Sequence, residues 1–576
     1  MPLTRDDSTA SVEAVLRNQE LLMLIFGYFL PLDPTRLEKD GLLKGRRQLL
    51  KLALTCKAFQ EPAMSCLWSC LESLTPLMKL LPNLQIMNNA YYFYGALPED
   101  CAFRRYGRRV RVLNLQDRRP GTAVPDNGDP VAPPPTISSE TYVLIARELK
   151  GGSMLPALRR VYLDSPGEAP SADFAALPAL LSSSVEALIL SGTGLGNAVF
   201  SSYYFPMASH HLQSLKYLSL HTASASLKPA TFDTILELRS LETLDLRLPQ
   251  SVDLPPQKLF DLTRNLTCLK SLTLDVHFAA HRVSHAFYRY SASEIGFAPP
   301  RLEKLHLFSR AHNTICGCLP AFLLEQLTHL TLIISDPSFR TEGHFQSLVT
   351  TLSQIPTFKA LIIESVPRPP PNHFAPPRRA LAIGWNAVRL LLAELSLTEL
   401  EVDIPINYGE SGGLLPILQD AFTPRPDGPP RKLKKLGLPP IVGSGRYYDN
   451  TAPALSLMDL CEVANHAHGL EHLAFVLRVG SVDDIARMLS EAKNAGNKSQ
   501  SVLRTLRIWD VKNAILPAKG CRMLAELLDL LFPTLESIQP YAASHASSPG
   551  AYWSAYWEDI EELRQTYRTL RIYRTS

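Results

Sequence analysis

Hydrophobic residues along this chain recur in the pattern Leu-x-x-Leu-x-Leu, where x is mostly polar. In the copy that begins at Leu241, Leu244 and Leu246 would share one face of an extended chain, because side chains alternate along a strand. Asp245 and Arg247 would share the other face. We therefore predict a short, half-buried strand at every copy. The fifteen copies begin at Val110, Leu158, Val185, Leu215, Leu241, Leu269, Leu302, Leu327, Phe358, Leu397, Leu433, Leu470, Leu503, Leu535 and Tyr567.

Amphipathic segments that fit helices lie between several of the predicted strands. They fall at residues 231–238, 345–355, 388–395, 482–495 and 521–532. Strands joined by crossover helices form a parallel sheet, and a single such unit cannot bury its apolar face alone. Helices are wider than the spacing between strands, so the strands would line the concave side of a curved array. We predict one irregular array over residues 76–576, with an ordinary parallel α/β sheet as the alternative.

A second apolar pattern, with helical spacing, precedes the repeats. Residues 18–30 form one short amphipathic segment, and residues 48–59 form another after a polar stretch at residues 31–47. Glu61 and Pro62 suit a turn into a third segment. The apolar positions of that third segment are Met64, Leu67, Trp68, Leu71 and Leu74. We predict an all-helical module at residues 18–75, behind a disordered N-terminus at residues 1–17.

The helical module resembles the F-box, through Glu20-Leu-Leu-x-x-Ile-Phe, then Leu52-Ala-Leu-Thr-Cys-Lys-Ala-Phe59, then Leu67-Trp68. The resemblance spans residues 18–71 and implies docking on the adaptor subunit of an SCF-type cullin–RING ubiquitin ligase. The residues that would carry this docking are Leu21, Leu22, Ile25, Phe26, Phe29, Leu52, Cys56 and Phe59. The alternative is a helical cap over the open end of the repeat array, which needs the same amphipathic faces.

The repeats themselves resemble the leucine-rich-repeat superfamily of the ribonuclease-inhibitor type. That resemblance implies an α/β solenoid shaped as a horseshoe, with parallel strands on the concave face and helices outside. Four stretches rich in proline or polar residues, at residues 118–136, 367–377, 423–430 and 443–453, are predicted to be loops. Such loops can carry partner contacts, although tolerated insertion without a function is the commoner explanation.

Composition limits the possible functions. A net charge of +3 over 576 residues gives no electrostatic reason to expect nucleic acid or a membrane surface as partner. The N-terminus lacks the apolar stretch of a secretory signal, and no window of about 18 apolar residues predicts a membrane span. Nine scattered cysteines fit reduced thiols, so we expect a cytoplasmic or nuclear protein.

Catalytic and metal-binding motifs are not apparent in the sequence. The phosphate-binding loop, Gly-x-Ser-x-Gly and His-Glu-x-x-His patterns are all missing. Neither the His210-His211 pair nor His466 and His468 have a third ligand nearby, and Cys316 and Cys318 lack the usual zinc spacing. We therefore expect a protein that is not an enzyme and needs no cofactor and no metal.

Residues that alternate with the repeat leucines would point away from the core and form the partner-binding face. The candidates for substrate binding are Tyr217, His221, Asp245, Arg247, Asp275, Lys304, His306, Glu364, Glu399, Glu401, Asp403, Arg507, Trp509 and Tyr573. The four acidic residues between Glu364 and Asp403 in this set fall on consecutive predicted strands and would form an acidic patch. Trp509 and Tyr573 have the composition of interface anchors, but aromatic residues also pack under loops and charges also serve simply as a solvated face.

Taken together, these patterns predict the substrate-recognition subunit of an SCF-type ubiquitin ligase. The helical module would dock on the adaptor and cullin assembly, and the repeats would hold an unidentified target protein. The chain would then contribute to ubiquitin transfer only by bringing the target close to the ubiquitin-conjugating enzyme. The alternatives are a leucine-rich-repeat scaffold or inhibitor with no ligase connection, and a hydrolase on an irregular α/β sheet.

Overall fold

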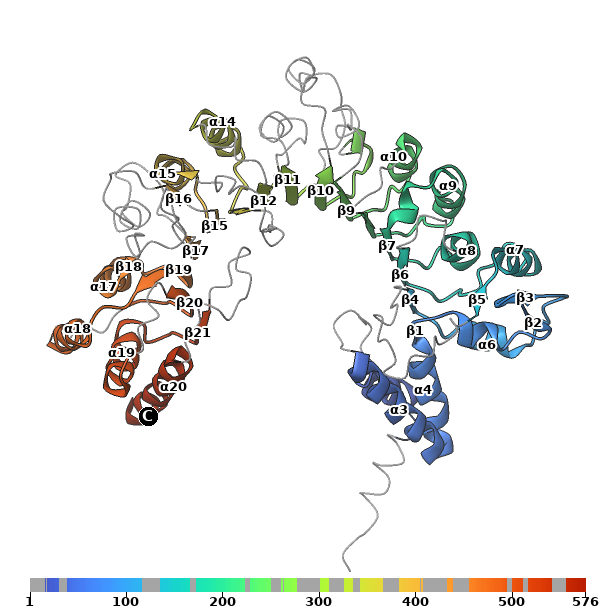
Figure 1. Ribbon diagram of the computed structural model, residues 1–576, viewed down its shortest axis with the longest axis horizontal. Helices are drawn as coiled ribbons and strands as arrows, with labels where there is room; N and C mark the ends of the chain where they lie inside the picture. Colours follow the sequence, from blue (N-terminus) through green and yellow to red (C-terminus); the bar gives the residue numbers. More distant parts are fainter. Residues whose placement is uncertain are drawn as a thin grey trace, which may run out of the picture. The chain divides into compact units, whose positions relative to one another are not determined.

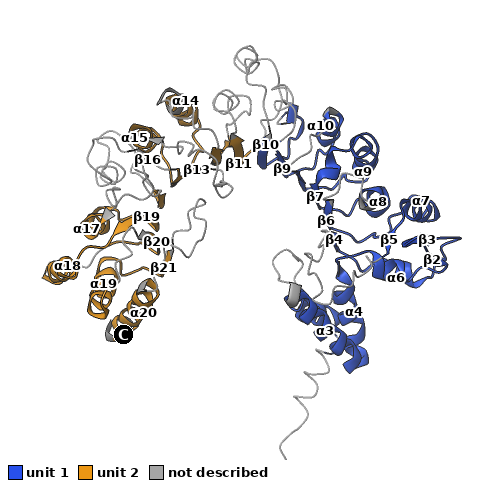
Figure 2. Ribbon diagram, viewed as in Figure 1, with its two compact units in different colours: residues 1–278 blue, residues 279–576 orange. Residues whose placement is uncertain are grey.

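The computed structural model divides the chain into two compact units, Met1–Phe278 and Ala279–Ser576 (Figure 2). The residues that the structure describes are 16, 18–30, 39–115, 135–165, 172–222, 228–249, 261–262, 264–276, 301–309, 326–334, 342–365, 383–404, 406–407, 433–438, 455–494, 500–510, 516–540 and 556–575. Three of the predicted loops, at residues 367–377, 423–430 and 443–453, lie outside this set, as do Cys316 and Cys318. Almost all of residues 1–17 and 118–136 also lie outside the described set.

Unit 1 begins with three helices, α2 (Gln19–Gly27), α3 (Lys39–Thr55) and α4 (Lys57–Ser69). They enclose a small core centred on Leu22, Phe26 and Leu49. The second predicted helical segment begins earlier than residue 48, because α3 starts at Lys39, within the polar stretch at residues 31–47. Gly45 permits this, since a Cβ atom at that position would overlap the carbonyl oxygen of Phe29.

A parallel ladder of strands follows in unit 1. Its order is β1 (Cys70–Leu71), β4 (Val112–Leu115), β6 (Arg160–Ser165), β7 (Ala187–Gly192), β8 (Tyr217–His221), β9 (Thr243–Leu248) and β10 (Ser271–Val276). The repeat leucines are in register, so that Leu218, Leu244 and Leu272 lie side by side. All three are fully buried. The predicted strands of this part of the chain are therefore confirmed.

Helical segments connect these strands and pack on one side of the ladder (Figure 1). They are α5 (Thr75–Met78), α6 (Ala102–Gly107), α7 (Ser139–Glu148), α8 (Ala172–Leu180), η2 (Thr193–Gly196), η3 (Phe200–Tyr204), α9 (Phe205–Ser209) and α10 (Pro229–Leu236). The predicted helix at residues 231–238 corresponds to α10. Buried aromatic side chains fill the space between helices, with the Phe200 ring centroid 5.1 Å from that of Phe174 and 5.5 Å from that of Phe205.

A small separate sheet in unit 1 was not predicted. It pairs β2 (Leu84–Met87) with β3 (Ala90–Phe93) as a hairpin, and β5 (Thr136–Ile137) joins β3 in parallel. Asn88 and Asn89 form its two-residue turn with φ angles of 50° and 59°. Positive φ at both positions is typical of the type I′ turn that matches strand twist, and Asn tolerates this conformation. The Asn-Asn pair was thus a usable sequence signal.

Unit 2 contains a second parallel ladder. Its order is β11 (Lys304–Ser309), β12 (His329–Ile334), β13 (Ala360–Ser365), β15 (Glu399–Asp403), β17 (Lys435–Gly437), β19 (His472–Arg478), β20 (Thr505–Asp510) and β21 (Ser537–Pro540). The short β18 (Leu455–Ser456) pairs with β19, and β14 (Ile383–Gly384) pairs with β16 (Ile406–Asn407) away from the ladder. Again the leucines are in register, as Leu400, Leu436 and Leu473 show.

The helices of unit 2 also lie on one side of its ladder (Figure 1). They are α14 (Glu342–Ser353), α15 (Trp385–Glu394), α17 (Leu457–His466), α18 (Val482–Asn494), α19 (Ala518–Leu531) and α20 (Tyr556–Thr575). The first residues of α17 are fixed by a capping box between Ser456 and Asp459, and Ser481 and Asp484 make the same reciprocal hydrogen bonds at α18. Four of these helices match the predicted segments that follow residue 344.

The last predicted strand, at residues 567–572, was wrong, because these residues belong to α20. A spacing of three residues between Tyr567 and Leu570 fits one face of a helix as well as a repeat copy. The preceding sequence decides between a strand and a helix, because Trp557, Ile560 and Arg564 recur at helical spacing and are completely buried. Helix α20 packs on α19 and ends the unit. The array therefore holds fourteen of the fifteen predicted strands, together with the unpredicted β1.

Helix α20 is attached through arginine side chains that bind backbone carbonyl groups. The Arg564 guanidinium donates to the Leu535 oxygen at 2.8 Å and to the Glu536 oxygen at 3.3 Å. It also pairs with the Glu561 carboxylate at 2.8 Å. Arg571 donates to the Asp529 oxygen at 2.9 Å and to the Pro533 oxygen at 2.7 Å. The two bonds from Arg571 occupy carbonyl groups at and just beyond the end of α19, where helix carbonyl groups lack partners within the helix.

Within the described residues, no helix combines the length and the apolar character needed to cross a membrane.

Candidate protein-binding surfaces

Side chains of each ladder divide between two faces. The repeat leucines point toward the helices and are buried, so the alternate residues lie on the opposite side, here called the open face. Thirteen of the fourteen predicted substrate-binding residues lie on ladder strands at open-face positions, as expected. Tyr573 is the exception, because it belongs to helix α20. Trp509 lies on β20, but its side chain is outside the described set.

On the open face of unit 1, some of the charged side chains pair with one another. Arg247 donates from Nε to Asp245 Oδ1 at 3.1 Å, and Arg247 is in register with Asp275 on the next strand. Asp245 is only 9% exposed. Partial burial raises the pKa of the neighbouring Tyr217 hydroxyl, and the Asp245 charge adds to this effect. These predicted binding residues therefore already contact one another, and His221 lies in register with Arg247.

The predicted acidic patch is formed on β13 and β15 of unit 2. These strands are neighbours, with Glu364 in register with Asp403, while Glu401 and Glu399 lie beside Ile362 and Ala360. Partial burial raises the pKa of the Glu364 carboxyl, and the charges of Asp403 and Glu401 raise it further. Lys435 on β17 pairs with Glu401 at 2.7 Å and offsets part of this charge.

We expect Glu364→Gln to stabilise unit 2 at neutral pH, by a few tenths to about 1 kcal/mol, because it removes a charge opposite Asp403. The folded-state pKa of Glu364 lies above the ordinary value of 4.5. The folded chain therefore binds this proton more tightly than the unfolded chain, and stability falls as pH rises from about 4.5 through the raised pKa. Urea unfolding at several pH values should show that, as pH rises, the free energy of unfolding falls less for Glu364→Gln than for the wild-type chain. An unchanged pH slope would contradict this account.

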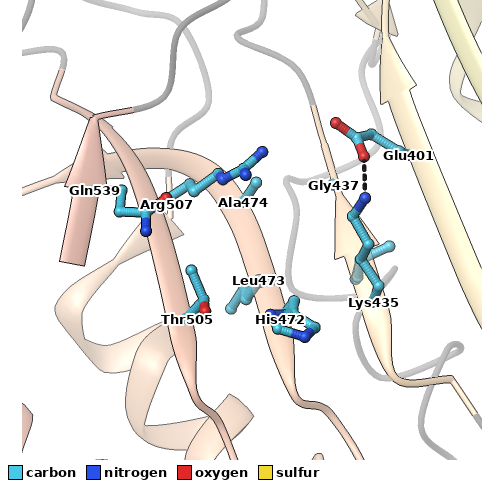
Figure 3. A pocket seen from close by; sticks show the side chains of 10 residues that line it. Glu401, Lys435, Gly437, His472, Leu473, Ala474, Thr505, Arg507 and Gln539 are labelled. Atoms are coloured by element: carbon cyan, nitrogen blue, oxygen red, sulfur yellow. Dashed lines mark ion pairs between the residues drawn. The ribbon is translucent and has the colours of Figure 1, made fainter. Parts of the chain in front are cut away.

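A hollow interrupts the open face beside the acidic patch (Figure 3). Its volume is about 160 Å³. The same cross-strand row carries Glu401, Gly437, Ala474, Arg507 and Gln539 in that order. The two smallest residues lie in the middle of the row, so they leave space between the longer side chains of Glu401 and Arg507. Lys435, His472 and Thr505 line the hollow in the adjacent row.

Gly437 is required at the floor of this hollow. A Cβ atom there would lie 2.9 Å from Cγ of Glu401, closer than side-chain carbons approach one another. Sequence reasoning singled out Arg507 and Glu401 but missed Gly437, Ala474 and Gln539. The available signal was a pair of small residues, Gly437 and Ala474, at repeat positions where other copies carry larger ones.

A second candidate surface lies on helix α2 of unit 1. Four large apolar side chains, here called the α2 stripe, are exposed: Leu21 by 37%, Leu24 by 69%, Ile25 by 43% and Tyr28 by 89%. Their spacing places them on one face of the helix. Helix α3 exposes a similar series, Leu43, Leu50 and Leu54, with Leu54 exposed by 79%. Contiguous apolar surface of this kind is typical of an interaction site.

Several residues predicted to bind the adaptor are instead core residues of the module. Leu22 and Phe26 are each 3% exposed, and the Phe26 ring packs edge-on against Phe59 at 5.3 Å. Phe29 and Leu52 also pack against this core. Leu22 and Phe26 therefore lie inside the module core, and their predicted docking role stays a prediction. Leu21, Ile25 and Cys56 are exposed and remain candidates, while Leu24 and Tyr28 were missed.

The helical module is continuous with the ladder of unit 1. Strand β1 directly follows α4 and pairs with β4, and the Arg111 amide donates to the Ser69 oxygen at 2.8 Å. Glu61 of α4 pairs with Arg109 at 2.6 Å, and the Trp68 ring lies 4.6 Å from that of Tyr106. The predicted third helix therefore ends at Ser69, and Leu71 is a strand residue.

Among the described residues, no three His, Cys, Asp or Glu side chains come together as metal ligands would. His466 pairs with Glu462 on the same helix, with 3.1 Å between Nε2 and the carboxylate.

Comparisons with known proteins give little further information. No family model matches the chain, and no curated protein matches it. Among solved structures, a leucine-rich-repeat protein of Leptospira interrogans aligns with 65% of this chain and 81% of its own length, at 12% identity and a TM-score of 0.26. A TM-score of this size carries no argument about fold or function, so the fold rests on the strand ladders described above.

Proposed function

We propose that this chain is a substrate-recognition subunit of an SCF-type ubiquitin ligase. In this proposal the helical module docks on the ligase adaptor, and the open face of the repeat ladder holds a target protein. The chain itself performs no chemistry, and it acts in the cytoplasm or nucleus by bringing the target close to the ubiquitin-conjugating enzyme. The F-box resemblance of residues 18–71 supports the assignment.

The exposed α2 stripe is the observation that carries this proposal. Leu24, Ile25 and Tyr28 expose large apolar side chains to solvent, although α2 already buries its opposite face in the module core. Burial of such side chains against a partner contributes about 25 cal/mol per Å² of apolar surface. A helical cap that only covered the end of the ladder would have no need for a second apolar face.

We expect the triple variant Leu24→Ser, Ile25→Ser and Tyr28→Ser to lose association with the adaptor and cullin. Removing three central apolar anchors should weaken binding by at least about 100-fold. Co-purification of the tagged full chain from cells, read by mass spectrometry, measures this. The control is Ile86→Ser, Met87→Ser and Tyr94→Ser, which removes three exposed apolar side chains at the β2–β3 hairpin instead. Equal recovery of adaptor with both variants would contradict the docking assignment.

The rival proposal is a leucine-rich-repeat scaffold with no ligase connection, in which the helices only cap the ladder. Deleting residues 18–71 cannot separate the two, because it removes β1 and exposes the edge of β4. Under both proposals, the chain that lacks these residues would be unstable. Substitutions in the α2 stripe avoid this difficulty, since they leave the module core and β1 unchanged.

A further inference from the structure

We propose that the hollow on the open face of unit 2 binds a carboxylate side chain, Asp or Glu, of the target protein. This inference rests on the proposed function, because it names the chemistry of the partner at the same face. The hollow is bounded by Glu401 and Lys435 on one side and by Arg507 and Gln539 on the other, with Gly437 and Ala474 between them (Figure 3).

Hydrogen-bond donors dominate the walls of the hollow. Lys435, Thr505 and Arg507 all present polar hydrogens, and His472 and Gln539 add two more polar side chains. Glu401 is the one carboxylate among the lining residues, and Lys435 already binds it at 2.7 Å. A ligand that accepts hydrogen bonds therefore fits this lining better than one that donates them.

Arg507 supplies the charge that a carboxylate would balance. Its side chain is exposed, and it has no acidic partner among the described residues. Figure 3 shows the side chain reaching from β20 across the neighbouring strand toward Ala474, which leaves the guanidinium at the hollow. A guanidinium binds a carboxylate through two parallel N–H···O bonds, and such charge-assisted bonds are stronger than neutral ones.

The charges around the hollow favour a carboxylate over a phosphate group. One positive charge, that of Arg507, remains after Lys435 and Glu401 pair. A phosphorylated side chain carries about −1.5 to −2 charge at neutral pH. It would also place the additional charge beside Glu401, the carboxylate that lines the hollow. A single negative charge matches this environment.

The depth of the hollow depends on the small residues in its floor. Ala474 is 7% exposed, so a longer side chain at this position would extend into the space between Arg507 and Glu401. Ala474→Leu therefore blocks the hollow without changing any charge. Arg507→Leu removes the charge without filling the floor. The two variants act on different features of the same proposed site.

The test uses a library of random 12-residue peptides displayed on phage, selected on the full chain after removal of peptides that bind Ala474→Leu. Selected peptides are then synthesised with amidated C-termini and measured by fluorescence anisotropy. We expect them to contain Asp or Glu, and to lose about ten- to 100-fold in affinity on Arg507→Leu. Changing that acidic residue to its amide should cause a similar loss, and the two changes together should cost little more than either alone.

Arg504→Leu is the matched control, because Arg504 is an exposed arginine of the segment leading into β20 and lies outside the hollow. The Arg504→Leu substitution should change the affinity of the selected peptides by no more than about threefold. Selected peptides without an acidic residue, peptides indifferent to Arg507→Leu, or failure to recover any peptide would each overturn the proposal. Tighter binding of a phosphoserine version would overturn the choice of a carboxylate. The assay contains no adaptor, so its outcome is independent of the docking test.

Discussion

Leu244→Asp is expected to unfold much of unit 1. The Leu244 side chain is completely buried between Leu218 and Leu272 on the neighbouring strands. Truncating a buried leucine costs about 2–5 kcal/mol, and a buried carboxylate without a partner adds to that. The total, roughly 5 kcal/mol or more, is comparable with the whole stability of many domains. Because stacked repeats share their cores, the loss should spread to the adjacent strands.

Thr243→Asp is the matched control for this prediction, since it places the same charge one residue earlier on the half-exposed open face. It should change the free energy of unfolding by less than about 1 kcal/mol. Urea unfolding followed by circular dichroism compares the two variants. Similar midpoints for both would contradict the assignment of buried and open faces.

Arg564→Met is expected to destabilise the C-terminal end of unit 2 by about 3 kcal/mol. The guanidinium is completely buried, and it binds two backbone carbonyl groups and the Glu561 carboxylate. Removing one partner of a buried ion pair typically costs about 3–5 kcal/mol. The lower end of this range applies because Glu561 keeps some contact with solvent, its side chain being 21% exposed.

Arg568→Met is the comparison for Arg564, one helical turn further along α20. Arg568 is half-exposed and makes a single bond to the Leu535 oxygen, at 3.1 Å. Its replacement should cost about 1 kcal/mol or less, the usual net contribution of one hydrogen bond. Hydrogen exchange of β21 and α19 amides would locate the loss. Equal costs for the two arginines would show that burial of Arg564 does not have the role given to it here.

The strands were predictable because the period of two is specific. Alternation such as that of Leu244 and Leu246 with Asp245 has few interpretations other than a half-buried strand, and fourteen copies formed strands. Residues 567–572 failed because Tyr567 and Leu570 satisfy helical spacing equally well. The choice depended on Trp557 and Arg564, which lie outside the repeat pattern and gain their meaning only when α20 packs on α19.

The surfaces were less predictable than the fold. Helix α2 has apolar residues on both faces, so its sequence could not show that Leu22 and Phe26 are buried while Leu24 and Tyr28 are exposed. The acidic patch followed from strand order alone, since Glu364 and Asp403 needed only adjacent strands in register. The hollow required the register of five strands as well as the small size of Gly437 and Ala474, which no single repeat copy reveals.

Docking of the helical module can be measured directly with the purified full chain and a purified SCF-type adaptor subunit, by calorimetry and size-exclusion chromatography. We expect a stable complex with the wild-type chain and with the Ile86, Met87 and Tyr94 control. We expect no complex with the variant in which Leu24, Ile25 and Tyr28 are replaced by serine. Absence of binding by the wild-type chain, or undiminished binding by the α2 variant, would contradict the assignment of this chain as a ligase subunit.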